Sequence, residues 1–130
     1  MPLHLEAISQ RTFVHRVRMD ARTKHLLFTS VPLGGYRNAR EAALLKAEGA
    51  NAGCPDLLFF EPSYTPDPGI ARSKFVGLAI EMKAGKNKPT KAQMEWHAKL
   101  SVRGWYVATC YSADEAWETL FGYLGLKVTP

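Results

Sequence analysis

Two acidic residues and a lysine stand out in the sequence because they lie at the ends of apolar runs. Asp56 follows Gly53 and Pro55 and opens the run "DLLFFE", whereas Glu81 and Lys83 close the run "FVGLAIEMK". Side chains alternate along a strand, so Glu81 and Lys83 would share one face. Two neighbouring carboxylates repel each other, and a divalent cation that prefers oxygen ligands relieves that repulsion. A lysine beside the cation can hold a water molecule or stabilise charge on a phosphate.

These groups converge if the two apolar runs pair as antiparallel strands. Residues 62–74 contain three prolines and a glycine, which predicts a loop at the far end of the pair. Asp56 would then begin one strand close to where Glu81 ends the other. The alternative is that Glu81 and Lys83 form an exposed ion pair at a fraying strand end. A second Pro-Asp pair contains Asp67, which no apolar run follows, and we interpret it as a turn residue.

The remaining pattern predicts the elements that must hold these residues. Helix-like spacing begins near Glu6, and capping residues are expected at Asn38, Thr90 and Ser112. The predicted strands cover residues 25–31, 57–61, 75–83 and 105–111, and the later helices cover residues 38–49, 90–104 and 112–126. The resulting order, α-β-α-β-β-α-β-α, predicts an α/β fold with a mixed β-sheet flanked by helices.

Size and composition narrow the class of protein. A chain of 130 residues is expected to form one domain spanning residues 1–130. The net charge of +5 and the sequence pI near 9.4 favour a polyanionic partner, although a solvated basic surface would give the same values. The apolar runs are too short to span a bilayer, and no signal peptide is evident. Cys54 and Cys110 fit neither a metal knuckle nor a disulfide framework, so we expect reduced cysteines in a cytoplasmic protein.

Asp56 and the triplet Glu81-Met82-Lys83 form a D…ExK signature, and the chain resembles the PD-(D/E)xK nucleases. The wider pattern is more specific, with a glutamine ten residues after the lysine and "GWYV" on a following strand. From about residue 5 to about residue 124 the chain is similar to a small stand-alone VRR-NUC domain, the virus-type replication-repair nuclease of phages and bacteria. The resemblance implies a restriction-endonuclease-like fold.

The resemblance also implies an activity and a set of site residues. The expected activity is a DNA endonuclease that uses Mg²⁺ or Mn²⁺, selects branched DNA such as four-way junctions, and acts as a homodimer in replication, repair or recombination. Asp56, Glu81 and the main-chain carbonyl of Met82 would bind the metal, and Glu6 would complete the acidic cluster. Lys83 would be the catalytic lysine, and Gln93 would support the site. The alternative for Glu6 is a partly exposed residue at a frayed terminus.

Basic residues around this site are assigned to the DNA backbone, whose recognition carries no sequence information. They are Lys86, Lys88 and Lys91 after the ExK strand, and Arg37 and Arg40 around the glycine-rich loop. The histidines show no metal-ligand spacing, and we expect His97 to be a packed or half-exposed helix residue. Two other functions stay open: a non-catalytic DNA-binding module with the same fold, and a metal-dependent hydrolase of small substrates.

Overall fold

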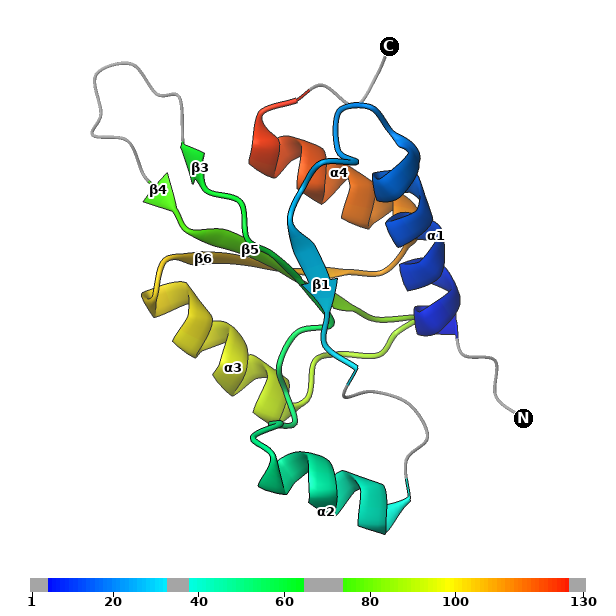
Figure 1. The fold of residues 1–130 in the computed structure, drawn as a ribbon, viewed down its shortest axis with the longest axis vertical. Coiled ribbons are helices and arrows are strands. Elements are labelled where there is room, and N and C mark those ends of the chain that lie inside the picture. Colours follow the sequence, from blue (N-terminus) through cyan, green and yellow to red (C-terminus); the bar gives the residue numbers. More distant parts are fainter. Residues whose placement is uncertain (1–4, 33–37, 65–73, 127–130) are drawn as a thin grey trace.

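A computed structural model describes residues 5–32, 38–64 and 74–126 (Figure 1). Asp67 and Arg37 lie outside these residues. The elements, in chain order, are α1 (Leu5–Met19), β1 (Phe28–Ser30), α2 (Ala39–Ala47), β2 (Leu57–Phe59), β3 (Ser63–Tyr64), β4 (Lys74–Phe75), β5 (Gly77–Met82), α3 (Lys91–Val102), β6 (Trp105–Cys110) and α4 (Ala113–Leu124). The predicted α/β class is confirmed, with every predicted helix and strand present.

The sheet is mixed, as predicted, and its strand order is β1-β2-β5-β6. β2 pairs with β1 and β5 in antiparallel fashion, and Leu57 is opposite Ile80 in the second pair. β5 and β6 are parallel, with α3 as the crossover helix between them. This topology places the start of β2 and the end of β5 at the same edge of the sheet, where the sequence predicted that Asp56 and Glu81 meet.

Two predictions about strand extent were wrong. Part of the expected loop of residues 62–74 forms a short antiparallel pair, β3 with β4, which is possible because neither strand contains a proline. The strand predicted over residues 75–83 is broken at Val76, whose N–H donates to the carbonyl of Gly104 at 2.9 Å. The chain therefore pairs with β3 before this break and with β2 and β6 after it.

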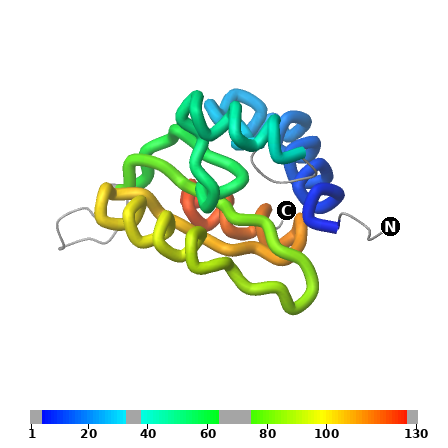
Figure 2. The backbone as a smooth tube through the Cα atoms, turned by 90° about the horizontal axis from the view of Figure 1, so that it is seen from below, coloured from blue at the N-terminus to red at the C-terminus, as the bar shows by residue number. Residues whose placement is uncertain are grey.

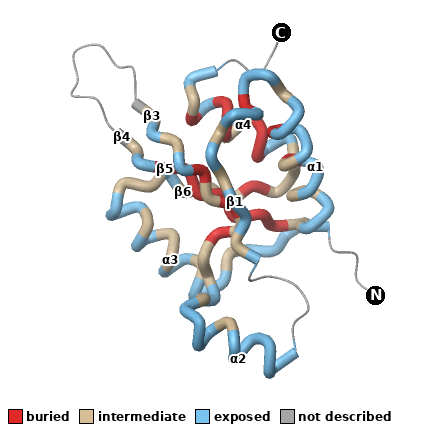
Figure 3. The backbone as a smooth tube through the Cα atoms, in the orientation of Figure 1, coloured by how far each residue is buried: buried red, intermediate tan, exposed pale blue. Residues whose placement is uncertain are grey.

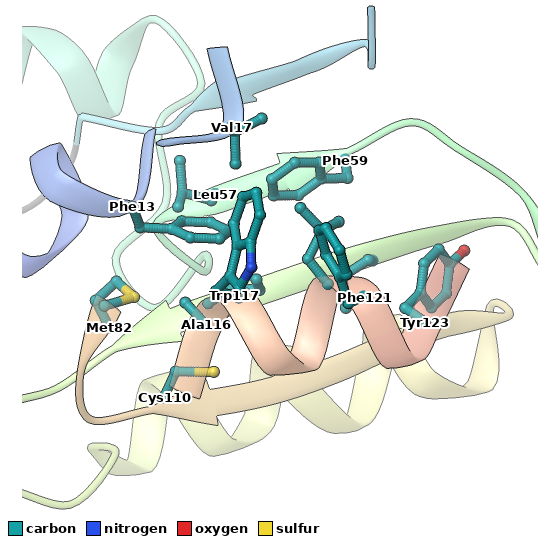
Figure 4. Packing of buried hydrophobic residues seen from close by; sticks show 13 residues of the cluster. Phe13, Val17, Leu57, Phe59, Met82, Cys110, Ala116, Trp117, Phe121 and Tyr123 are labelled. Carbon is teal, nitrogen blue, oxygen red and sulfur yellow. The ribbon is translucent and has the colours of Figure 1, made fainter. Parts of the chain in front are cut away.

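The main core lies on one face of the sheet, under α1 and α4. From β5 it receives Leu78, Ile80 and Met82, each at most 1 % exposed. Figure 4 shows this cluster between α1, α4 and the sheet, with α3 on the opposite side. Glu81 and Lys83 belong to the α3 side of β5, as the predicted alternation requires.

The helices begin at the predicted capping residues. The side-chain oxygens of Asn38, Thr90 and Ser112 each accept a hydrogen bond from the N–H three residues ahead. α2 has no buried residue and lies apart from the sheet, whereas the central strands β2 and β5 are largely buried (Figures 1 and 3). Among the described residues, no helix has the length and apolar character needed to cross a membrane.

Candidate active site

Asp56 and Glu81 are brought together by the register of β2 and β5. Leu57 is opposite Ile80, so one further step along each strand places Asp56 opposite Glu81. The N–H of Met82 donates to Asp56 Oδ2 at 2.7 Å, and the N–H of Val31 donates to the Asp56 carbonyl at 2.8 Å. Asp56 is thus bonded through its side chain to β5 and through its main chain to the segment after β1.

The turn before Asp56 packs directly on α3. Gly53 has φ of +103°, and a Cβ built there would lie 2.6 Å from the carbonyl oxygen of Ala92 and 3.0 Å from the ring of Trp96. Only glycine combines this backbone conformation with so close an approach. Pro55, which follows, is fully buried. Gly53 and Pro55 therefore fix the turn that leads into Asp56.

Glu81 is a buried carboxyl, with a side chain only 2 % exposed. Burial raises the pKa of Glu81 from its ordinary value of 4.5 to about 9, with further contributions from a hydrogen bond to Asp56 and from the charge of Asp56. The charge of Lys83 acts in the opposite direction, and that of Glu6 raises the pKa slightly more. Ionising Glu81 next to Asp56 therefore costs free energy unless a positive charge compensates the two carboxyls.

Lys83 lies on the same side of β5 as Glu81 and is only 8 % exposed. Its main-chain N–H donates to the carbonyl of Cys110 at 2.9 Å, which extends the pairing with β6 by one residue. The interpretation of Glu81 and Lys83 as an exposed ion pair at a fraying strand end is therefore wrong. Both charged groups are held inside the protein, Glu81 within β5 and Lys83 directly after its last residue.

His97, predicted as a packed or half-exposed helix residue, lies next to Glu81. Its Nε2 lies 3.5 Å from Glu81 Oε1, and neither atom has a hydrogen-bond partner among the described residues. Burial, and then the charge of Lys83, lower the pKa of His97. The signal was its position four residues after Gln93, which puts both on one helix face.

Cys54 also borders the acidic pair. It is a half-buried free thiol, and Cys110 is a buried one, so neither forms a disulfide, as expected. Burial, followed by the charges of Glu81 and Asp56, raises the pKa of Cys54. A thiol in these surroundings stays protonated and uncharged at neutral pH.

The other predicted ligands and supporting residues are placed as follows. Glu6 is half-buried in the first turn of α1, and its charge reaches Glu81. Within the described part of the chain, no three His, Cys, Asp or Glu side chains are grouped as a metal site, so Glu6 does not complete a preformed cage. The side chain of Met82 is in the core. Gln93 accepts the N–H of Thr90 at 2.8 Å and closes a capping box.

The predicted DNA-binding lysines surround the connection from β5 to α3. Lys86 and Lys88 are exposed in this connection, and Lys91 is exposed at the start of α3. Figure 2 shows the connection extending to one end of the molecule before it turns back into α3. Arg40 is exposed on α2, and Arg37 is outside the described residues. The three lysines are thus exposed within eight residues after Lys83.

This geometry agrees with what comparison with known proteins shows. A model of the VRR-NUC domain family matches residues 5–114. The chain belongs to the VRR-NUC family. It is therefore a member of a nuclease family, of the type that acts on DNA and generally uses divalent metal ions. The family resemblance predicted from Asp56, Glu81 and Lys83 is confirmed.

A solved structure titled "VRR_NUC domain protein" shares the fold. It superposes with a TM-score of 0.71 at 23 % identity, and the match covers 97 % of this chain and 93 % of that one. A search of curated proteins gave no match. The likeness covers nearly the whole chain and is a likeness of fold.

Proposed function

We propose that this VRR-NUC chain is a metal-dependent DNA endonuclease that hydrolyses phosphodiester bonds with Mg²⁺ or Mn²⁺. The observation that carries the proposal is the half-buried carboxyl of Asp56 next to the buried carboxyl of Glu81, on the same side of the sheet as the buried Lys83. Burying Glu81 and Lys83 next to a second carboxyl is costly unless a partner compensates their charges. A divalent cation and a phosphate supply such a partner.

The donor set fits a hard divalent cation. Asp56 and Glu81 offer carboxylate oxygens, and the carbonyl of Met82 would add a third oxygen ligand. One oxygen of Asp56 is occupied by the N–H of Met82, which leaves Oδ1 outside that hydrogen bond. Glu6 is proposed as a further ligand from α1. When bound, the cation would lower the pKa of a water molecule and stabilise the leaving oxygen.

The chain's own residues supply the remaining functions. Lys83 would orient the attacking water and balance the charge that develops on the scissile phosphate. Gln93 would support the site from the first turn of α3, which it also caps. The phosphate backbone would be contacted by Lys86, Lys88, Lys91, Arg37 and Arg40.

We further propose that the active form is a homodimer that selects branched DNA, such as four-way junctions. A two-fold axis would present two equivalent sites to two strands of such a substrate. Sedimentation velocity at micromolar concentration tests the oligomeric state. A stable monomer in the presence of junction DNA would contradict the dimer.

Cleavage of end-labelled four-way junctions, flaps and linear duplexes tests the activity. We expect cleavage with Mg²⁺ or Mn²⁺, none with EDTA, and the highest rate on the branched substrates. Lys83→Met should abolish cleavage. Glu118→Gln is a matched control, because Glu118 is exposed on α4, across the sheet from the site. Binding of DNA without cleavage under all conditions would indicate a non-catalytic module instead.

A further inference from the structure

His97 and Glu81 present two polar atoms to each other inside the protein. Nε2 of His97 and Oε1 of Glu81 are 3.5 Å apart, both are buried, and each lacks a hydrogen-bond partner among the described residues. Buried polar atoms nearly always have a hydrogen-bond partner in folded proteins. Two such atoms that face each other without a partner in the described part of the chain therefore call for an explanation. The His97 side chain is itself only 18 % exposed, so bulk water does not readily satisfy it.

We propose that His97 is a positioning residue that holds Oε1 of Glu81 through its Nε2–H, so that the carboxylate presents its other oxygen to the cation beside Asp56. The inference rests on the proposed function, because it requires Asp56 and Glu81 to bind a cation. A shift of about half an ångström brings Nε2 and Oε1 to an ordinary N–H···O distance. The Nε2–H exists in one neutral tautomer and in the charged imidazole, so the contact requires no particular charge.

The imidazole is carried by an element that is itself well fixed. α3 begins at the capping box of Thr90 and Gln93, and the carbonyl of Ala92 lies against Gly53. The turn that contains Gly53 leads directly into Asp56. This contact joins the helix that carries His97 to the turn that leads into Asp56. Groups that hydrogen-bond to metal-binding carboxylates fix the orientation of those carboxylates and contribute to metal affinity.

A direct role of His97 as a metal ligand fits the structure less well. Asp56, Glu81 and His97 are not arranged as a three-donor metal group within the described residues. The two roles differ in metal preference, because an imidazole ligand favours Mn²⁺ over Mg²⁺ whereas a positioning contact affects both ions alike. Metal preference therefore separates them experimentally.

The test is metal binding by the full chain without DNA. Mn²⁺ binding is followed by the loss of the free-ion EPR signal, and Mg²⁺ binding by competition against Mn²⁺. His97→Leu removes the donor, and we expect both ions to bind about tenfold more weakly or worse. His97→Gln retains an N–H at a similar distance and should stay within about threefold of the wild type. His15→Leu, which changes an exposed histidine on α1, should bind as the wild type does.

Several outcomes would overturn the proposal. These are wild-type affinity in His97→Leu, equal losses in His97→Leu and His97→Gln, or a loss confined to Mn²⁺. Should His97→Leu fail to fold by circular dichroism, His97→Asn takes its place, because its shorter amide does not reach Glu81 and the same tenfold loss is expected. A wild-type chain that binds neither ion would instead contradict the proposed function.

Cleavage kinetics give a second readout. A positioning role predicts that His97→Leu raises the metal concentration needed for half-maximal cleavage of a four-way junction by about tenfold. At saturating metal, the cleavage rate should return to within about threefold of the wild type, because Lys83 and both carboxylates remain. A rate that stays a hundredfold or more below the wild type at saturating metal would assign His97 to the chemical step and overturn the positioning role.

Discussion

Asp56 on the β2 side and Met82 on β5 are joined by a hydrogen bond of 2.7 Å from the Met82 N–H to Asp56 Oδ2. This bond fixes the side chain of Asp56, one proposed ligand, to the main chain of Met82. Met82 directly follows Glu81, the other proposed ligand. The spacing of the acidic pair is therefore a property of the sheet register and does not depend on a loop. Residues that set this register or the turn before Asp56 should affect activity without touching DNA.

Stability without metal should fall as the pH rises from 7 to 9. The folded-state pKa of Glu81 is about 9, above its ordinary value of 4.5, so between these values the unfolded chain binds fewer protons than the folded one. In this range Glu81 ionises readily in the unfolded chain but not in the folded one, so the free energy of unfolding decreases progressively up to pH 9. The lowered pKa of His97 acts in the opposite direction only below about 6.5, outside the measured range.

Thermal unfolding in EDTA at several pH values checks this. The fall in midpoint temperature should be smaller in Glu81→Gln, which removes the titrating group, while burial and the charge of Asp56 still raise the pKa of Cys54. Added Mg²⁺ should raise the midpoint more at pH 8.5 than at pH 7, because it binds the ionised pair. A wild-type midpoint that rises with pH in EDTA would refute the assignment.

Gly53→Ala should destabilise the protein by about 2 kcal/mol or more, through backbone strain at positive φ together with the clash against Ala92. Gly49→Ala is a matched control, because Gly49 has a similar φ of +108° with nothing within 4 Å of the added Cβ. Urea unfolding of both variants separates strain from clash. Equal losses of stability in the two variants would show that the approach of α3 to Gly53 costs nothing.

Gln93 has two assignable roles, and one substitution separates them. Gln93→Glu preserves the capping box, since glutamate serves as well as glutamine at this position. If Gln93 supports the reaction through its amide, Gln93→Glu should unfold like the wild type but cleave DNA at least tenfold more slowly. The control is Thr90→Val, which should lose about 1 kcal/mol of stability through the lost cap. Full activity of Gln93→Glu would leave Gln93 with the capping role alone.

The lysines of the β5–α3 connection should contribute to DNA affinity in a salt-dependent way. Replacing Lys86, Lys88 and Lys91 by glutamine should weaken binding similarly for all sequences. The slope of log affinity against log salt should become shallower by about one unit for each phosphate contact removed. Fluorescence anisotropy in EDTA measures this, with Lys24→Gln as an exposed control near the end of α1. An unchanged salt slope would place the DNA elsewhere.

Much of this site was predictable because it depends on local patterns. The alternation along β5 assigned Leu78 and Ile80 to one face and Glu81 to the other, and the proline-rich segment implied the antiparallel return that brings in Asp56. Helix starts followed from capping residues such as Thr90, whose signal is contained within four residues.

The contacts that the sequence did not predict depend on packing between distant elements. The face of α3 that carries His97 was visible in the sequence. Its position opposite Glu81 is set by how closely the helix approaches the sheet, which Gly53 determines from a third segment. The pairing of β3 with β4 was missed for a similar reason, because proline content predicts a loop but not how the residues flanking it pair.

Asp56 and Glu81 are proposed to hold the divalent cation that supports DNA cleavage. Single-turnover cleavage of a labelled four-way junction tests this proposal, with wild type and Asp56→Asn compared in EDTA and after Mg²⁺ is restored in excess. Asp56→Asn removes one negative charge while keeping an oxygen that can accept the Met82 N–H, so the fold should persist. We expect no cleavage in EDTA, recovery with Mg²⁺ in the wild type, and at least a hundredfold lower rate in Asp56→Asn. Cleavage by the wild type in EDTA, or a wild-type rate in Asp56→Asn, would contradict it.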